Sequence, residues 1–185
     1  SSGDVVFKAS GYIQVSADID TNGGNVILWS DSDGNGITAN ERVSLSNSAI
    51  TTQGGGVWIG GSYGSNGNGT SWTARSGDTV TVGDGYSYAG SSSGLSYGSY
   101  ITGSTIDTTL SGGTGGNVSI YAWGAGVGSS LNGGIELRNS SIETGGGTVD
   151  IEGVGDYSGS TSYLAGVIIG GGSSITSGAG DISIR

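Results

Sequence analysis

Cysteine, histidine, proline and methionine are all absent from the 185 residues of this chain. Without cysteine it has no disulfides, thiolate nucleophiles or thiolate metal ligands, and without histidine it has no imidazole base or imidazole ligand. These absences remove most of the common catalytic machinery. We therefore expect the chain not to be an enzyme.

Positive charge is also scarce, with five Lys or Arg against fifteen Asp or Glu and a formal net charge of -10. Such a chain repels nucleic acid and anionic membrane surfaces. No run approaches the roughly 20 apolar residues that a membrane helix needs. We expect neither nucleic-acid binding nor membrane insertion, and the start at Ser1 without Met or signal peptide suggests a fragment of a longer protein.

Glycine is abundant instead, at 42 residues, whereas only 33% of the residues are hydrophobic. This composition alone would also suit a disordered linker. However, Val, Ile and Leu recur in short alternating triplets, such as Val43-Ser44-Leu45 and Ile182-Ser183-Ile184. Alternation of this kind predicts short strands rather than disorder.

A long internal repeat is the strongest signal, because residues 23–59 match residues 115–151 at an offset of 92 positions. Turn residues keep this offset, as Gly23-Gly24-Asn25 and Gly115-Gly116-Asn117 show. The matched apolar positions are Val26, Leu28, Val43, Leu45, Ile50, Val57 and Ile59, followed by Val118, Ile120, Ile135, Leu137, Ile142, Val149 and Ile151. Both strands and turns are therefore repeated in register.

A shorter unit of about 30 residues lies inside the long repeat: an apolar doublet, a central Ile, a Thr or Ser with a glycine turn, and another doublet. The central Ile stands seven residues before the next strand, as at Ile50 and Val57 or Ile142 and Val149. One unit is too small to fold alone, but stacked units form a continuous thin core. The sequence predicts an all-β solenoid of about six rungs, forming a single domain over residues 1–185.

Longer segments rich in Gly, Ser, Asn and aromatic residues separate the rungs, at about 29–42, 60–79, 121–134 and 152–166. We expect them to be loops that leave the solenoid at one corner. The triplet Val80-Thr81-Val82 resembles a strand, but no partner for it is evident in the sequence.

The units at residues 24–34, GNVILWSDSDG, and 50–57, ITTQGGGV, resemble the repeats of filamentous-haemagglutinin-like bacterial exoproteins and adhesins. The resemblance spans most of the chain. It implies a right-handed parallel β-helix, exported by a two-partner or autotransporter route to the bacterial cell surface or the extracellular space. It implies no catalytic residues.

One acidic loop follows the beginning of a calcium-binding pattern, with Asp31, Asp33 and Asn35 at alternate positions and Glu41 as a late carboxylate. Glu41 stands one place short of the position used in EF-hand loops, and the matching loop after Tyr121 has no acidic residue. A solvated loop with Asx turns explains the pattern equally well. Calcium is the only cofactor that the sequence suggests.

Most aromatic residues fall in the long loops rather than at inward positions. Exposed rings stack on sugars, so five of these residues are candidates for glycan binding: Tyr63, Trp72, Tyr86, Tyr88 and Trp123. The alternative is that the rings cover the flank of the solenoid or pack against one another.

A pair of carboxylates for glycoside cleavage must also be considered, because Asp150 and Glu152 lie two residues apart near a strand end and we expect Glu136 and Glu143 to face the same neighbourhood. Parallel β-helix lyases require a basic residue beside such a cluster, and in sequence only Arg138 lies near. Solvated outward faces explain these acids better, so an enzyme that degrades polysaccharides is the least favoured hypothesis.

The sequence thus favours a non-catalytic segment of a secreted bacterial adhesin, a rigid stalk with loops that recognise a host or neighbouring cell surface. Glycans are the candidate ligands. The alternative is a subunit of an extracellular filament or matrix, because uncapped rungs favour end-to-end association.

Overall fold

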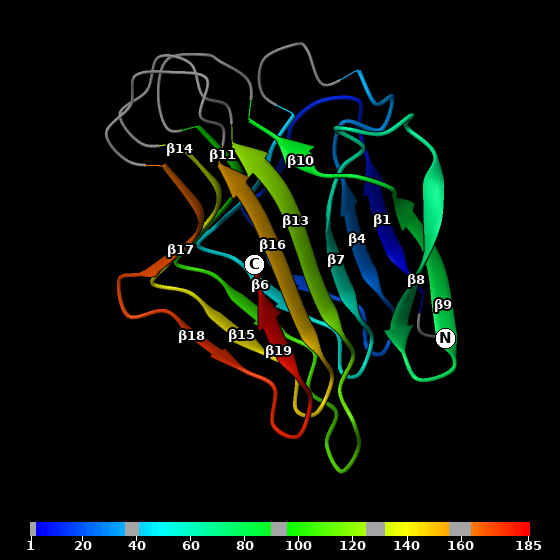
Figure 1. Ribbon diagram of the computed structural model, residues 1–185. Helices are drawn as coiled ribbons and strands as arrows, with labels where there is room; N and C mark the ends of the chain where they lie inside the picture. Colours follow the sequence, from blue (N-terminus) through cyan, green and yellow to red (C-terminus); the bar gives the residue numbers. More distant parts are fainter. Residues whose placement is uncertain (1–2, 36–40, 90–95, 125–131, 156–163) are drawn as a thin grey trace.

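The computed structural model describes residues 3–35, 41–89, 96–124, 132–155 and 164–185, whose strands form three parallel sheets around one core (Figure 1). Sheet A contains β1 (Val5–Lys8), β4 (Val26–Trp29), β7 (Val57–Gly60), β13 (Val118–Gly124), β16 (Val149–Gly155) and β19 (Ile182–Ile184), with β10 (Ser87–Tyr88) beside β13. Sheet B contains β2 (Ile13–Val15), β5 (Val43–Ser46), β11 (Ser96–Thr102), β14 (Asn132–Arg138) and β17 (Leu164–Gly170). Sheet C contains β3 (Ile19–Asp20), β6 (Ala49–Thr51), β12 (Thr105–Asp107), β15 (Ser141–Glu143) and β18 (Ser174–Thr176).

The fold is a parallel β-solenoid, as predicted, because successive strands visit sheets B, C and A in a repeating order. Five stacked strands in sheet B, from β2 to β17, correspond to four turns. In sheet A, Val26 pairs with Val57 and Val57 with Val118, which are steps of 31 and 61 residues. Together they make the 92-residue repeat. The right-handed winding and the number of about six rungs remain predictions.

The core consists of the inward positions that the repeat predicted. Parallel pairing in register places each residue on its counterpart in the preceding rung, so Val57, Val118 and Val149 form one column. The buried members of this core are Ile13, Val15, Val26, Leu28, Val43, Leu45, Ile50, Val57, Ile59, Ile101, Ile106, Val118, Ile120, Ala122, Ile135, Leu137, Ile142, Val149 and Ile151. Burial of one Val, Leu or Ile side chain contributes about 1.5–3 kcal/mol. Two such columns in each of sheets A and B and one in sheet C therefore sustain the stack.

Hydroxyl groups recur at the corner between sheets C and A. In each rung a buried Thr or Ser donates a hydrogen bond to a glycine carbonyl oxygen at the end of the same turn. The pairs are Thr21 with Gly24, Thr52 with Gly55, Thr108 with Gly116, Thr144 with Gly147, and Ser177 with Gly180. This bond explains the Thr or Ser before each glycine turn in the repeat, because a hydroxyl facing the core must be hydrogen-bonded.

The glycines that accept these bonds stack directly on one another. A Cβ on Gly116 would lie 2.1 Å from the carbonyl oxygen of Gly55, and one on Gly147 would lie 2.2 Å from that of Gly116. The neighbouring atoms belong to the backbone and have no free space. This column therefore requires glycine because of close approach between rungs.

A second corner, between sheets B and C, uses a residue in the left-handed conformation in four of its five turns, the turn between β2 and β3 being the exception. The residue is Asn47, Gly103, Asn139 or Gly171, with φ between 49° and 64°. Asn and Gly adopt this conformation most readily, so the Asn47 and Asn139 match in the sequence reflects a shared backbone geometry.

The connections after β4, β7, β13 and β16 lead from sheet A to sheet B and so leave the solenoid at its third corner, as predicted, whereas one longer turn, residues 108–117, lies between sheets C and A. The connection after β7 is not simply a loop: β8 (Gly69–Arg75) and β9 (Asp78–Gly83) form an antiparallel hairpin, shown at the right of Figure 1. The stretch from 60 to 79, expected to be a loop, thus contains the missing partner of Val80–Val82. Its period-2 pattern is weak because β8 carries only two apolar side chains, Trp72 and Ala74.

The two outermost strands of sheet A expose inward-facing side chains. Phe7, Ile182 and Ile184 are 46%, 45% and 45% exposed, because each strand has a neighbour on one side only. The described residues contain no helix of the length and hydrophobicity required to cross a membrane.

Candidate functional site

The outward face of sheet A changes along the stack, unlike the inward face. The row that begins with Ile27 continues through Trp58 and Ser119 to Asp150. Ile27 and Trp58 are buried beneath the hairpin together with Val82, and form a second, smaller hydrophobic cluster. The row therefore passes from an apolar, covered surface to a charged, open one.

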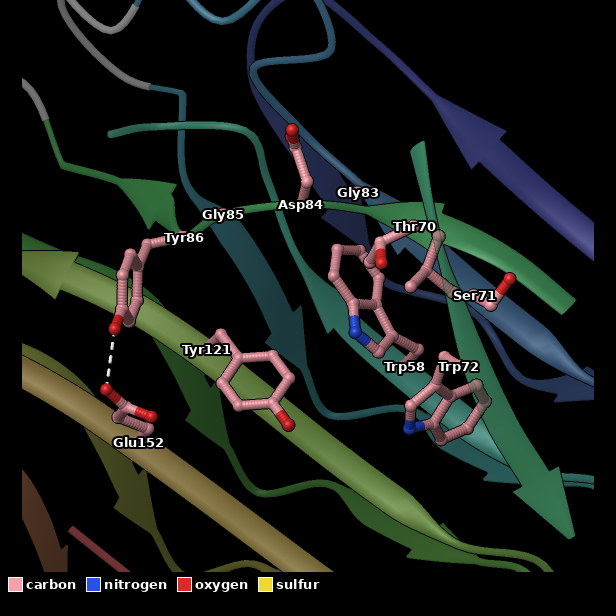
Figure 2. Close-up of a pocket in the computed structure, with 11 residues that line it drawn as sticks. Trp58, Thr70, Ser71, Trp72, Gly83, Asp84, Gly85, Tyr86, Tyr121 and Glu152 are labelled. Atoms are coloured by element: carbon pink, nitrogen blue, oxygen red, sulfur yellow. Dashed lines mark hydrogen bonds between the residues drawn. The ribbon is translucent and has the colours of Figure 1, made fainter. Parts of the chain in front are cut away.

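A hollow of about 300 Å³ lies where this cover ends (Figure 2). Trp58 and Tyr121 belong to the sheet beneath it, Trp72 lies on the hairpin side, and Tyr86 lies on the opposite side beside Glu152. The other lining residues are Thr70, Ser71, Val82, Gly83, Asp84 and Gly85. Aromatic rings beside hydroxyl groups and carboxylates offer both stacking surfaces and hydrogen-bonding groups to a ligand.

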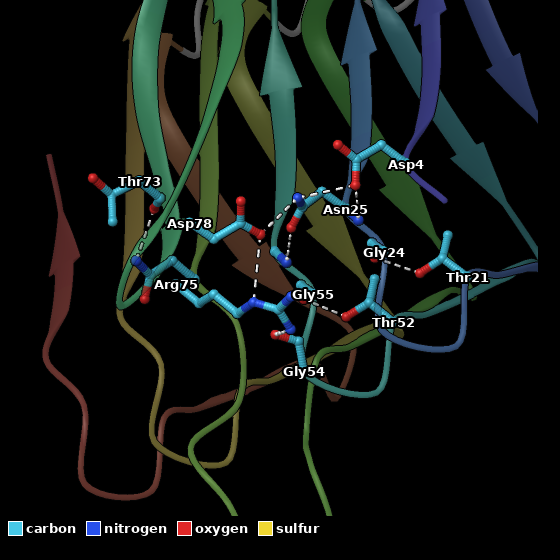
Figure 3. Close-up of polar contacts among 12 residues, drawn as sticks. Asp4, Thr21, Gly24, Asn25, Thr52, Gly54, Gly55, Thr73, Arg75 and Asp78 are labelled. Atoms are coloured by element: carbon cyan, nitrogen blue, oxygen red, sulfur yellow. Dashed lines mark hydrogen bonds and ion pairs between the residues drawn. The ribbon is translucent and has the colours of Figure 1, made fainter. Parts of the chain in front are cut away.

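The hairpin is fixed to the solenoid at its turn (Figure 3). The Arg75 guanidinium donates a hydrogen bond to the Gly54 carbonyl oxygen at 3.3 Å and forms an ion pair with Asp78 at 3.4 Å. The Asn25 amide donates to the other side of this turn, at 3.2 Å from Asp78 Oδ2. On the strand itself, the Trp72 indole N–H donates to Ser119 Oγ at 3.0 Å. These bonds hold the Trp72 ring at the hollow.

A network of five side chains adjoins the hollow, and three of them, Tyr86, Tyr121 and Glu152, line it. The Tyr86 hydroxyl donates to Glu152 Oε1 at 2.6 Å, and the Tyr121 hydroxyl donates to Asp150 Oδ2 at 2.7 Å. Arg185 joins the two carboxylates, at 2.9 Å from Glu152 Oε2 and 3.0 Å from Asp150 Oδ1. Each carboxylate is thus held by one phenol and by the guanidinium.

The protonation states in this network are well defined. Burial, reinforced by the hydrogen bond to Glu152, raises the pKa of Tyr86 to about 12. Burial and the bond to Asp150 raise the pKa of Tyr121 to about 12. The hydrogen bonds from Tyr86 and Arg185 lower the pKa of Glu152. Both phenols therefore remain donors, and Glu152 remains an ionised acceptor, over the physiological pH range.

The structure brings the five predicted glycan-binding residues to one side of sheet A. Trp72 and Tyr86 line the hollow. Tyr63 stacks on Tyr88, with ring centroids 4.1 Å apart, and meets Trp123 edge-on at 5.0 Å. Trp123 also contacts Tyr86 edge-on at 5.9 Å. Packing between rings, the predicted alternative, is thus present beside the hollow.

All four predicted calcium residues lie within the described ranges, whereas residues 36–40 of the same loop lie outside them. Asp31 and Glu41 are buried, whereas Asp33 is exposed and accepts a hydrogen bond from the Asn35 amide at 2.6 Å. Within the described ranges, no group of three or more Asp or Glu side chains is placed to hold a metal ion. Calcium binding by this loop remains a prediction.

The grouping of acids expected from the sequence is wrong in two respects. Glu136 lies on sheet B and Glu143 on sheet C, so neither is beside Asp150 and Glu152 on sheet A. The basic residue beside the pair is Arg185, whereas Arg138 forms an ion pair with Glu136 at 2.7 Å. Arg185 follows β19, which pairs with β16, and this contact between rungs brings together residues 33 positions apart.

Sequence reasoning also missed Trp58 and Glu152 as lining residues, and it placed Tyr121 in a loop. All three alternate with inward-facing neighbours in their strands, so the period-2 pattern places them on the outward face. Comparison with protein-family models, curated proteins and solved structures gives no match.

Proposed function

We propose that this chain is a non-catalytic, adhesive segment of a secreted bacterial surface protein. In this proposal the solenoid is a rigid stalk, and the hollow on sheet A binds carbohydrate on a host or neighbouring cell. The resemblance to filamentous-haemagglutinin-like repeats supports the extracellular location, and the stacked rungs suit an extended support.

The observation that carries the proposal is the hollow itself. Three partly exposed aromatic side chains, Trp72, Tyr86 and Tyr121, line it together with hydroxyl and carboxylate groups. The apolar face of a sugar ring stacks on aromatic rings while its hydroxyl groups form hydrogen bonds, and this site offers both. The fixed hairpin and the Arg185 network provide a preformed site, which reduces the entropy lost on binding.

The state of the carboxylates supports binding rather than cleavage. Glycoside hydrolysis requires one carboxyl group with a raised pKa to act as the general acid. Glu152 has a lowered pKa, and both Glu152 and Asp150 are held by Arg185. This pairing suits a fixed acceptor of hydrogen bonds.

A glycan-binding panel with the whole chain tests the proposal. Wild type is expected to bind at least one class of glycan, and Trp72→Ala to weaken that binding about tenfold, the value of one aromatic contact. Tyr12→Ala is the matched control, since Tyr12 is 38% exposed and does not line the hollow. Absence of binding across the panel, or equal loss in the control, contradicts the proposal.

A filament or matrix subunit is the second candidate, and the exposed inward residues at both edges of sheet A favour it. Phe7 lies in the core column of Leu28, and Ile184 in that of Ile151, so two copies stacked end to end would continue this column. Measurement of mass in solution decides this point. A single species of 18.0 kDa excludes self-assembly, whereas long polymers support it.

A further inference from the structure

A second group of aromatic side chains adjoins the hollow, and most of its members do not line the hollow. Tyr63, Tyr88 and Trp123 form with Tyr86 a continuous set of ring contacts, which we call the aromatic row. Tyr86 also lines the hollow, so the row begins where the hollow ends. All four residues are partly exposed. Rings packed only to fill a core would be buried instead.

Strand β13 places the hollow and the aromatic row in line. Ser119, Tyr121 and Trp123 alternate with the inward residues of β13 and therefore face outward. Ser119 holds Trp72, Tyr121 lies beneath the hollow, and Trp123 belongs to the row. Residues two apart in a strand are separated by about 7 Å, so the outward side chains of β13 follow one another along a single line.

The backbone of the row is as well fixed as that of the hollow. Tyr88 on β10 pairs with Trp123 on β13, and Tyr63 forms an antiparallel bridge with Tyr86. These pairings join the segment after β7 and the segment after β9 to the edge of sheet A. The rings are therefore presented by paired strands rather than by an independent loop.

The charge around this surface selects against acidic ligands. Asp84 and Glu152 line the hollow and Asp150 lies beside it, and in the described part of the chain the cation paired with this group is Arg185, which leaves a formal charge of -2. Arg185 is held by both of its carboxylate partners. The chain as a whole carries a charge of -10. Carboxylate or sulfate groups on a glycan would be repelled.

We propose that the hollow and the aromatic row form one continuous track that binds a linear, uncharged oligosaccharide over several consecutive sugar units. This inference rests on the proposed carbohydrate binding and specifies its ligand class. One sugar unit occupies the hollow beside Trp72 and Tyr121, and the following units lie along Tyr86, Trp123 and Tyr63.

The test is the dependence of affinity on chain length. Gluco-, manno-, xylo- and N-acetylated chito-oligosaccharides of one to six units are titrated against the whole chain by calorimetry, with oligogalacturonates as the acidic comparison. At least one neutral series is expected to bind, with each unit that reaches a further ring increasing affinity about two- to tenfold. Oligogalacturonates of equal length are expected not to bind.

Variants in the row separate the track from the hollow. Trp123→Ala is expected to leave the shortest ligand unaffected and to abolish the gain with length, and Tyr63→Ala is a second, milder test if Trp123→Ala unfolds. Tyr100→Ala is the control, because Tyr100 stacks on Tyr97 on sheet B, away from the track.

The outcomes distinguish the two proposals. Equal affinity for short and long ligands overturns the track but leaves sugar binding in the hollow intact. Stronger binding of oligogalacturonates overturns the choice of an uncharged ligand. If none of the neutral series binds, the track is overturned, and binding of other glycans in the wider panel then decides whether the proposed function survives.

Discussion

The two faces of sheet A are built from the same strands but follow different rules. On the inner face, Val57, Val118 and Val149 repeat almost without change, whereas on the outer face Trp58, Ser119 and Asp150 replace one another in the corresponding row. The inner residues contact their counterparts in the rungs before and after, so a change in one disturbs three rungs. The outer residues contact the hairpin where it covers them and face solvent where it does not.

This difference places the candidate site. The hairpin covers only part of the outer face, and the hollow lies at the boundary between the covered apolar residues and the open charged ones. The repeated inner residues stabilise the fold, whereas the outer residues, which do not repeat, form the candidate binding site. Four experiments test whether the two faces are as different as this comparison implies.

The largest effect is expected in the glycine column next to the inner face. Gly116→Ala should destabilise the fold by about 4 kcal/mol or more, because the new Cβ would lie 2.1 Å from a backbone oxygen that cannot move without separating two rungs. Urea unfolding monitored by circular dichroism measures this loss. Gly11→Ala is the control, since nothing lies within 4 Å of its Cβ, and equal stability of the two variants would refute the column's role.

Isoleucine truncation on each face compares the two cores directly. Ile120→Ala, on the inner face, should cost about 3–4 kcal/mol, and Ile27→Ala, on the outer face, about 2 kcal/mol, although both side chains are at least 99% buried. The cost is lower outside because a two-stranded hairpin can move into the cavity, whereas stacked rungs cannot. Equal losses in urea unfolding would show that the hairpin is as rigid as the solenoid.

Two asparagines 92 residues apart test the repeat with smaller effects. Asn25 Oδ1 accepts the buried Gly56 N–H at 2.7 Å, so Asn25→Ala should cost about 1–3 kcal/mol. Asn117 Oδ1 accepts the N–H of the exposed Thr148 at 2.9 Å, and water can replace it, so Asn117→Ala should cost less than about 1 kcal/mol. The reverse order in thermal melts would contradict this explanation.

The smallest effect is a pH dependence at high pH. The folded state keeps Tyr86, Tyr97 and Tyr121 protonated, with each pKa raised to about 12 by burial and by an adjacent carboxylate. The stability that the folded state gains from these protonated tyrosines is complete below about pH 10, the ordinary pKa of tyrosine. This stability is lost as the pH rises towards 12, the pKa in the folded state. Tyrosinate absorbance during titration measures this late ionisation.

Two variants show how much of the late tyrosine ionisation comes from the network beside the hollow. Tyr86→Phe and Tyr121→Phe should each remove part of the late phase, and neither should alter the far-ultraviolet circular dichroism spectrum at pH 7. Ionisation of Tyr86 and Tyr121 near pH 10 would show that the network of Asp150, Glu152 and Arg185 is open to solvent.

Most of the inner face was predictable from the sequence. The positions from Val26 to Ile59 and from Val118 to Ile151 repeat in register, and strict alternation shows which residues point inward. The corner hydroxyls and glycines follow from the same repeat. The hairpin was not predicted, since β8 carries only two apolar side chains, Trp72 and Ala74, and its partner β9 carried the only clear pattern.

The candidate site was predictable only in fragments. The aromatic residues Trp72 and Tyr86 were identified as ligand candidates, but the alternation that turns Trp58, Tyr121 and Glu152 outward was not applied to them. Arg185 was assigned no partner, because its partners Asp150 and Glu152 become neighbours only when β19 pairs with β16.

The sequence by itself thus determined the rung, the inward columns and the corner that carries the long connections, since each follows from periodic contacts between equivalent residues. The tertiary structure alone decided which outward residues meet: the hairpin over Ile27 and Trp58, the hollow at its edge, and the joining of two carboxylates by Arg185. The physical reason is that inward contacts repeat with the rung, whereas outward contacts join residues from different rungs and from an insertion that no period describes.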